Sequence, residues 1–377
     1  MSKPRILIIE NSVAVTGALK SIIRSSQGLS HYYDFVFLLP QNSEPLNTVK
    51  SMGFETLEFP MREIRKNISS VIAYLPLLVY NTQRLSNLLR RLHIDLIVVN
   101  DFYNLLPPVY KMFGGHLPYV CYVRFLPSKF PTPLVNTWCA LHHRYAHTTI
   151  AVSQAVKREL ATKENVVVIG NELPLEDISF SYGHGSTSIL YPANYIQGKG
   201  HEYALRSWAM ISKKHPQWKL RFVGGDMGLE KNKEFKKDLV KMSERLQLKD
   251  CVEWCEFSEK IADEYLAAAF VLNFSESESF SMTCLEAMFY GRPVIATYSG
   301  GPSEIIEQGV SGILVDLKDI DAMANAIEFL ISDVEKSEAM ARKAFELVRI
   351  KFSFANTIGK VKEVYQQSLG NSPAQIS

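Results

Sequence analysis

The feature that most constrains the fold is an alternation, along the whole chain, of short apolar runs with segments of helical periodicity. Strands that are apolar throughout and are separated by helices indicate a parallel sheet covered on both faces. Two series of such runs predict an α/β protein with two doubly wound domains. The runs lie at residues 5–10, 34–39, 95–99, 118–123, 148–152 and 166–169, and then at 188–191, 219–224, 251–254, 270–274, 293–296 and 312–315.

A break in periodicity at residues 171–188 marks the predicted boundary between the domains. This segment is rich in Gly, Ser, Pro and acidic residues. We place the first domain at residues 1–174 and the second at 175–352. A final helix is expected at 352–369, followed by a frayed tail. A chain of 377 residues is long enough for two cores of ordinary size.

Composition and charge narrow the class of protein. Five cysteines without a Cys-x-x-Cys pair argue against a disulfide framework or a zinc knuckle and fit a reducing, cytoplasmic compartment. The first strand leaves no room for a signal peptide before it. No apolar run reaches the ~20 residues of a spanning helix. The net charge of +2 hides an asymmetry, because residues 1–170 carry +8 and the rest carry −6. The first domain should therefore favour an anionic partner.

The stretch ESESFSMTCLEAMFYGRPVIATYSGGPSEII, residues 276–306, carries the most chemical information. It follows an apolar strand, so we expect a helix at about residues 281–290 with Gly291 as its C-cap. In an open α/β sheet, loops at the carboxyl ends of strands line the ligand crevice, and amides at the start of a helix can bind phosphate. This stretch is therefore the best candidate for a binding site.

Four residues of this stretch bear on its chemistry. Glu278 would precede the helix and Glu286 would lie inside it. Gly300 and Gly301 would reach the same edge of the sheet, where the backbone can approach a ligand closely. Taken singly, each acid fits a solvated surface residue and the glycines fit a turn. Their order and spacing carry the argument.

That order resembles the signature of the family 4 retaining glycosyltransferases, whose GT-B fold has two Rossmann-like domains facing a central cleft. The signature is Glu, seven residues and Glu, with Gly/Ser-Phe-Gly/Ser after the first and Ala-Met after the second. It appears here as ESFSMTCLEAM. The resemblance implies that Glu278 contacts hydroxyls of the donor sugar and Glu286 contacts those of the ribose. It also implies that the diphosphate is held by the backbone of Phe280, Ser281, Met282 and Thr283.

Two further segments resemble the donor site of that family. YPANYIQGKGHEYAL, residues 191–205, would place Lys199 on the donor phosphates, where it neutralises the charge of the departing nucleotide. The turn in FVGGDM would bring Gly224 to the donor. The family usually has Gly-Arg where this chain has Ala193-Asn194, so Asn194 would line the site without supplying a second cation.

The resemblance extends to domain roles. The first domain would bind the acceptor, the second would bind the nucleotide sugar, and residues 353–377 would return to the first. On the acceptor side, the glycine loop of the family is reduced to Gly17. Arg124 stands where many members have a His, so no catalytic His is carried over. Arg124 or Arg292 would then assist Lys199 at the phosphates.

No metal ion and no other cofactor is expected. His142, His143 and His147 lie close together, but the Glu of a His-Glu-x-x-His motif is missing, so ordinary helix-surface or cleft-lining histidines fit better. No Asp-x-Asp stands at a strand end in the way that metal-dependent sugar transferases require. Phosphate neutralisation by Lys199 and helix amides makes a metal unnecessary.

The segment at residues 61–95 is strongly basic, with Lys or Arg at positions 62, 65, 66, 84, 90 and 91. Leucines at 85, 88, 89 and 92 form an apolar stripe beside the last three of these. Such a helix suits peripheral contact with an anionic membrane, with Leu85, Leu88 and Leu92 touching the interface. It equally suits a helix packed on the first domain's sheet with its basic side in water.

These observations predict a hexosyl- or N-acetylhexosaminyltransferase, and the family resemblance implies that it retains the anomeric configuration. A nucleotide-diphosphate sugar, with UDP expected, would donate to a hydroxyl of a glycan or lipid-linked glycan, as in polysaccharide biosynthesis. No nucleic-acid partner is expected. Two alternatives stay open. One is a GT-B enzyme of another reaction type, such as a phosphorylase or a nucleotide-sugar 2-epimerase. The other is a catalytically weak member that binds a glycan or a partner.

Overall fold

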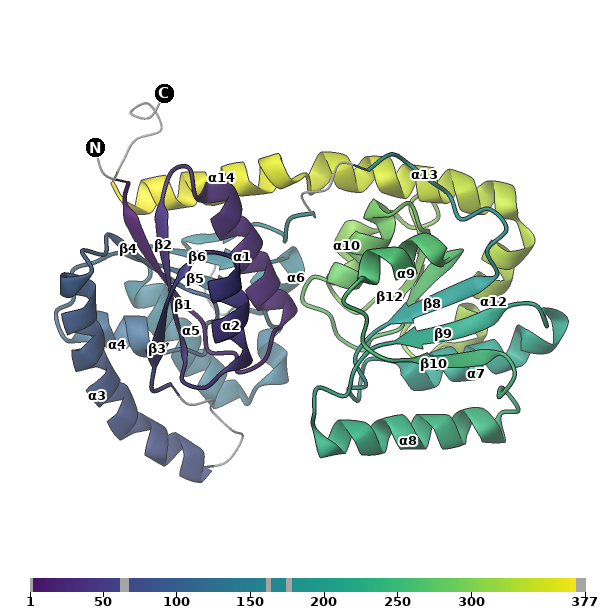
Figure 1. Ribbon diagram of the computed structural model, residues 1–377, viewed down its shortest axis with the longest axis horizontal. Coiled ribbons are helices and arrows are strands. Elements are labelled where there is room, and N and C mark those ends of the chain that lie inside the picture. The colour runs from purple at the N-terminus through teal and green to yellow at the C-terminus, as the bar shows by residue number, and fades with distance from the viewer. Residues whose placement is uncertain (1–2, 62–67, 161–163, 174–177, 371–377) are drawn as a thin grey trace. The chain divides into compact units, whose positions relative to one another are not determined.

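The computed structural model describes residues 3–61, 68–160, 164–173 and 178–370, and for residues 68–75 the backbone alone. Contacts divide the chain into two units, Met1–Glu172 with Ala355–Ser377, and Leu173–Phe354. The predicted boundary at residues 174 and 175 lies outside the described residues, two positions beyond this division. Figure 1 shows one parallel sheet with flanking helices in each unit.

The first unit is built on a seven-stranded sheet with the order β3-β2-β1-β4-β5-β6-β7, parallel at every described pairing. The middle strands β1, β4 and β5 are almost entirely buried, as apolar strands covered on both faces must be. The strands are β1 (Arg5–Ile9), β2 (Asp34–Pro40), β3 (Glu55–Phe59), β4 (Leu96–Val99), β5 (Tyr119–Val123), β6 (Thr148–Ala151) and β7 (Val166–Val168).

Strand β3 was not predicted from the sequence. Its residues, ETLEF, carry two glutamates and are mostly half-buried or exposed. The strand pairs only with β2, in the register Val36↔Glu55, and so lies at an edge of the sheet. An edge strand does not need the continuous apolar run that identifies a central parallel strand. All six apolar runs that were predicted in the first half are strands, as expected.

Seven α-helices accompany the first sheet among the described residues. One of them comes from the far end of the chain: α14 (Phe354–Ser368) packs Tyr365 edge-on against Tyr33, and Ser368 lies 3.1 Å from the imidazole of His147. The others are α1 (Gly17–Leu29), α2 (Glu44–Ser51), α3 (Ile68–Arg91), α4 (Leu106–Met112), α5 (Thr132–Tyr145) and α6 (Gln154–Glu159). No helix in the described part of the chain is both long enough and apolar enough to span a bilayer.

The second unit has a six-stranded parallel sheet with the order β10-β9-β8-β11-β12-β13. The order reverses beside β8, so β8 and β11 form the topological switch point where such folds bind ligands. The strands are β8 (Ser188–Pro192), β9 (Lys219–Val223), β10 (Val252–Cys255), β11 (Phe270–Asn273), β12 (Val294–Thr297) and β13 (Ile313–Val315). All six were predicted.

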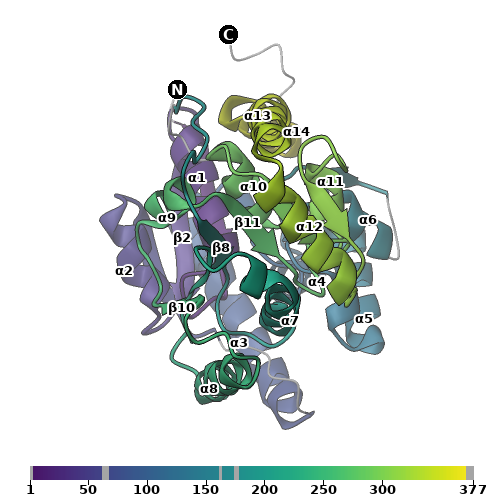
Figure 2. The same ribbon diagram turned by 90° about the vertical axis from the view of Figure 1, so that its right-hand side faces the viewer.

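Helices cover both faces of this sheet. In Figure 2, α7 and α12 lie together on one face, and α9 and α10 lie on the other. The apolar side of α7, with Leu205 and Trp208 fully buried, packs into a core shared with Ile327 of α12. The helices are α7 (His201–Ile211), α8 (Glu230–Arg245), α9 (Ile261–Ala267), α10 (Met282–Phe289), α11 (Pro302–Ile305), α12 (Ile320–Ser332) and α13 (Val334–Lys351).

Candidate active site

The predicted donor-site residues gather at one edge of the second unit. Parallel strands end on the same side, so the loops after β8, β9, β11 and β12 all leave the sheet at its carboxyl edge. Lys199 lies on the first of these loops and Gly224 on the second. The third leads through Glu278 into α10, and the fourth contains Gly300 and Gly301. Residues more than 100 positions apart are therefore brought to one edge.

The start of α10 is fixed by Ser281. Its backbone is left-handed, with φ at 81°, and its hydroxyl accepts the N–H of Cys284 at 3.3 Å as an N-cap. The Asn273 side chain, at the end of β11, donates to the same hydroxyl at 2.8 Å. The helix spans Met282–Phe289 and is followed by Gly291 at φ 68°, close to the predicted limits. The turn before α10 is therefore held rigidly by the strand that precedes it.

Glu278 is tied by its backbone to the glycine loop after β12. Its N–H donates to the carbonyl of Ser299, and its carbonyl accepts the N–H of Gly301, both at 2.8 Å. A Cβ on Gly301 would come within 2.2 Å of the carbonyl oxygen of Phe280. Only glycine permits this approach, which explains why position 301 of the loop after β12 is a glycine.

Lys199 and Glu278 form an ion pair, with 2.7 Å between Nζ and Oε1. The carboxylate side chain is 14% exposed and the lysine side chain 33% exposed, so the pair is partly shielded from water. The loop that carries Lys199 is held in place by Gly200, whose φ is 79° and whose Cβ would strike the carbonyl of Phe274. Tyr191 also donates its hydroxyl to the Lys199 carbonyl at 2.5 Å. The cation thus stands at a defined position beside the signature glutamate.

Glu286 lies on α10 with its carboxylate 3.4 Å from the hydroxyl of Tyr265, which donates to it. Burial, with the nearby carboxylate, raises the pKa of Tyr265 well above its usual range, so this phenol stays a donor. Tyr265 in turn stacks on Tyr290, with ring centroids 5.5 Å apart. Nothing in the sequence pointed to Tyr265, because the tyrosine lies 13 positions before Glu278 and outside the motif.

Asn194 joins the first two loops of the edge. Its side-chain oxygen accepts the N–H of Gly225 at 3.0 Å, and a Cβ on the neighbouring Gly224 would lie 2.0 Å from the Ala193 carbonyl. Thr283, in the first turn of α10, donates to the carbonyl of Pro192 at 3.4 Å. The loops after β8 and β9 and the start of α10 therefore abut. The ligand roles of all these residues stay predictions.

A second polar pair at this edge was missed. The Tyr203 hydroxyl, in the first turn of α7, donates to Glu276 at 2.5 Å, and the Glu276 N–H donates to the Gly198 carbonyl at 2.9 Å. Glu276 stands two residues before the signature glutamate, so its position in the loop could have been noticed. Its partner could not, because Tyr203 has no sequence relation to it.

The prediction that Arg292 assists at the phosphates is wrong. Its side chain is 1% exposed, and its guanidinium donates to the carbonyls of Tyr265 at 2.8 Å and Leu266 at 3.0 Å. These carbonyls belong to the end of α9, where a cation satisfies the last carbonyls of the helix. Arg292 therefore joins two elements of the fold and is not available to a ligand.

Arg124 is also buried, at 6% exposure, inside the first unit. Its Nε donates to Asn100 at 2.7 Å, and its Nη1 donates to Asn171 at 2.8 Å and Ser21 at 3.2 Å. The guanidinium carbon lies 4.4 Å from the ring centroid of Tyr122. The Arg124 guanidinium is therefore not exposed where it could bind a phosphate. Gly17 is the first residue of α1, with no atom near an added Cβ. Its acceptor-side role, like that of Arg124, stays a prediction.

Three acids that were not predicted from the sequence accompany Arg124 at the carboxyl edge of the first sheet. Glu10 follows β1, Asp101 follows β4, and Glu172 follows β7; all three are at most 3% exposed. Burial raises the pKa of Asp101 well above its usual range and raises that of Glu172 as well. The signal that could have found them is an acid within four positions after an apolar strand, because loops at the carboxyl ends of parallel strands line ligand sites.

The histidines of α5 and the loop after it have ordinary partners. His142 is 3% exposed, its Nδ1 lies 3.3 Å from the Tyr119 hydroxyl, and burial lowers its pKa to about 4. His143 faces Glu164 at 3.9 Å, and His147 faces Ser368 on α14. Among the residues that the structure describes, no group of three potential ligands is placed to hold a metal ion.

The basic helix α3 packs against the first sheet. Leu85 is fully buried and Leu89 is 2% exposed, so the prediction that Leu85 touches a membrane is wrong. Leu88 and Leu92 are half-buried, whereas Arg84, Arg90 and Arg91 are exposed. The basic positions 62, 65 and 66 lie outside the described residues. The leucine stripe faces inward because the helix needs an apolar side to cover the sheet.

Comparison with known protein families identifies the family to which the chain belongs. The family model "Glycosyl transferases group 1" matches residues 176–347, and the model "Glycosyltransferase Family 4" matches residues 50–176. The two models together cover residues 50–347 without a gap. The chain belongs to the family 4-type glycosyltransferases. The Glu278 motif, the Lys199 loop and the glycine loop of this glycosyltransferase all lie inside the group 1 match.

Individual relatives agree with the family. An uncharacterized glycosyltransferase of Haemophilus influenzae is 23% identical over 271 residues, which are 70% of this chain and 74% of the relative. D-inositol 3-phosphate glycosyltransferase of Corynebacterium kroppenstedtii is 32% identical over 194 residues, half of this chain. That alignment spans 42% of the relative, less than half of its length.

Solved structures establish the fold of this glycosyltransferase. The crystal structure of Anabaena Alr3699/HepE in complex with UDP-glucose has a TM-score of 0.82 at 22% identity, covering 96% of this chain and 99% of that one. Sucrose-phosphate synthase of Thermosynechococcus elongatus has a TM-score of 0.79 at 18% identity, covering 98% and 100%. The predicted GT-B fold, with two Rossmann-like units, is confirmed.

Proposed function

We propose that this glycosyltransferase takes a sugar from UDP or a similar nucleotide diphosphate and transfers it, with retention, to a hydroxyl of a glycan or lipid-linked glycan. The observation that carries the proposal is the Lys199–Glu278 ion pair at the switch-point edge of the second unit. A fixed ammonium suits a diphosphate, and a carboxylate, which only accepts hydrogen bonds, suits sugar hydroxyls. The UDP-glucose complex of Anabaena Alr3699/HepE supports the choice of nucleotide.

The proposed reaction needs no protein nucleophile. The acceptor hydroxyl oxygen would bond to the anomeric carbon as the bond from that carbon to the diphosphate breaks. The hydroxyl proton would pass to the leaving diphosphate oxygen on the same face of the sugar. Lys199 would balance the charge that develops on the diphosphate, and amides at the start of α10 would contribute further. Glu278 would orient the sugar hydroxyls.

Two glutamate variants test the assignment of the donor site. Glu286→Ala should weaken UDP binding on the order of tenfold, because a carboxylate that accepts ribose hydroxyl bonds is lost. Glu278→Ala should leave UDP affinity within about threefold and lower kcat, since its assigned contacts are with the sugar. Calorimetric titration with UDP and steady-state kinetics measure both. Wild-type affinity and kinetics in both variants would remove the basis of the assignment.

The proposed transfer is independent of metal ions. The sequence offers Lys199 and helix amides for the phosphates, and Asp319 of the Asp-Ile-Asp at 319–321 is engaged as the N-cap of α12, accepting the Ala322 N–H at 2.9 Å. Activity should therefore stay within about twofold of wild type in excess EDTA. Loss of activity in the chelator that manganese restores would show that the transfer uses a metal.

Peripheral contact with an anionic membrane through residues 61–95 is the remaining part of the proposal. It would depend on the exposed arginines of α3, because Leu85 is buried. Each such residue contributes about 1 kcal/mol near an anionic surface. Sedimentation with phosphatidylglycerol vesicles at low and high salt tests this contact, and failure to sediment at low salt would reject it.

A further inference from the structure

A groove of about 650 Å³ lies in the first unit, between α3 on one side and α4 with the loop at residues 113–118 on the other. Its floor includes residues 94 and 95, directly before β4, and residue 117, just before β5. It therefore opens near the amino ends of these strands, opposite the edge that carries Arg124. Its volume falls in the range of sites that hold small ligands. Nothing in the proposed transfer uses it.

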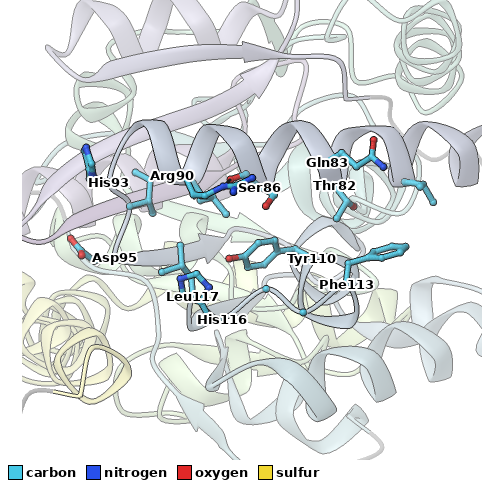
Figure 3. Close-up of a pocket in the computed structure, with 15 residues that line it drawn as sticks. Thr82, Gln83, Ser86, Arg90, His93, Asp95, Tyr110, Phe113, His116 and Leu117 are labelled. Carbon is cyan, nitrogen blue, oxygen red and sulfur yellow. Dashed lines mark hydrogen bonds between the residues drawn. The ribbon is translucent and has the colours of Figure 1, made fainter.

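The two walls of the groove differ in chemistry. Figure 3 shows Thr82, Gln83 and Ser86 on α3 facing Tyr110 and Phe113 across the groove. These three occupy one face of the helix. Ser86 offers a hydroxyl and Gln83 an amide, whereas Thr82 is 3% exposed and donates its hydroxyl to the Leu78 carbonyl at 2.8 Å. The opposite wall is mostly aromatic and aliphatic, and Phe113 is 68% exposed. A sugar residue has the same two aspects, because its C–H faces are apolar and its edge carries hydroxyls.

One end of the groove carries one cation, one carboxylate and two imidazoles. Arg90, His93 and His116 lie there in Figure 3, with Asp95 as the acid among them. The Arg90 guanidinium donates through Nη2 to the Asn87 side chain at 2.8 Å and through Nε to the Ser86 carbonyl at 3.4 Å, and these two bonds set its orientation. Asp95 already accepts the backbone N–H of Arg5 at 2.7 Å. With a charge of +8 on residues 1–170, this end favours an anionic group.

The loop opposite α3 is held in shape. The Lys111 ammonium donates to the carbonyls of His116 and Leu117, each at 3.3 Å. A Cβ on Gly115 would lie 2.4 Å from the Tyr110 ring, so glycine lets the loop close onto that ring. The groove is therefore formed before any ligand arrives, which lowers the entropic cost of binding.

We propose that this groove is a second, non-catalytic binding site for an anionic saccharide, one whose sugar residues carry carboxylate or phosphate groups. The sugar would lie against Phe113 with its hydroxyls toward Ser86 and its neighbours, and the anionic group would pair with Arg90. The choice of a saccharide, rather than another anion, rests on the proposed function. If one part of a long acceptor or product is bound in this groove, the rest of that molecule stays close to the same enzyme molecule. Its effective concentration there is then higher.

The test uses the full-length protein and calorimetric titration with hexagalacturonate. Arg90→Ala should weaken binding about tenfold or more, because it removes a charge-assisted contact. Arg91→Ala is the matched control: it removes the same charge from the next position of α3, but Arg91 lines a different hollow, with Arg84 and Phe59. It should weaken binding less than threefold. Ser86→Trp should abolish binding by filling the groove.

UDP titration of every variant serves as the folding control and keeps the two proposals apart. Intact UDP binding without hexagalacturonate binding overturns the groove proposal alone, whereas absent UDP binding in the wild type overturns the proposed function. If both arginine variants lost the same affinity for hexagalacturonate, binding would reflect the general surface charge, and the groove proposal would be overturned. Mannose 6-phosphate, titrated alongside, tells which anionic group is preferred. Binding of phosphatidylglycerol vesicles that Ser86→Trp abolishes, without saccharide binding, would assign the groove to a lipid instead and overturn the proposal.

Discussion

Replacement of Lys199 by alanine is expected to lower kcat/KM by about a hundredfold or more, which is the usual loss when a preorganised charge is removed from a leaving group. The Lys199 ammonium is 2.7 Å from the Glu278 carboxylate and sits on a loop fixed by Gly200 and Tyr191. Its removal also leaves Glu278 without its cation. Steady-state kinetics with a UDP-sugar donor measure the effect.

Two companion variants sharpen the Lys199 result. Lys199→Arg keeps the charge but not the shape of the ammonium and should recover part of the activity. Lys213→Ala removes an exposed lysine elsewhere in the same unit and should change kcat/KM less than twofold. If Lys199→Ala retained more than a third of wild-type kcat/KM, the phosphate role of Lys199 would be untenable.

Gly301→Ala is expected to destabilise the second unit by roughly 3 kcal/mol, the upper end of the cost of overpacking. The added Cβ would lie 2.2 Å from the Phe280 carbonyl oxygen, and backbone cannot yield as a side chain does. For a unit of this size the melting temperature should fall by about 6–12 °C. UDP affinity should fall as well, because the displaced loop is bonded to the backbone of Glu278 on both sides.

The control for Gly301 is Gly359→Ala on α14, where an added Cβ meets no atom within 4 Å. There the substitution should stabilise the protein by about 0.5–1 kcal/mol, because alanine favours a helix interior over glycine. Thermal denaturation and UDP titration of both variants check the pair. A Gly301→Ala protein with wild-type melting temperature and UDP affinity would show that the loop after β12 is more tolerant than its geometry implies.

Much of the fold followed from local patterns. A central parallel strand is buried on both faces, so its apolar run is visible in the sequence, and all strands except β3 were found that way. The helix at Met282–Phe289 was bounded by a cap residue and a glycine, which also act locally. Glu278 and Glu286 could be singled out because their spacing lies within one short segment. Edge strand β3 gave no such pattern, since half of it faces water.

Tertiary structure alone decided which charged side chains meet. Lys199 reaches Glu278 across 79 positions because parallel strands end at one edge, and the sequence does not give that distance. Arg292 and Leu85 were assigned to ligand and membrane from their chemical character, yet both are buried by elements remote in sequence. Periodicity gives the face of a helix, but not what covers it. Burial depends on how distant elements pack, and that information is spread over the whole chain rather than held in any segment.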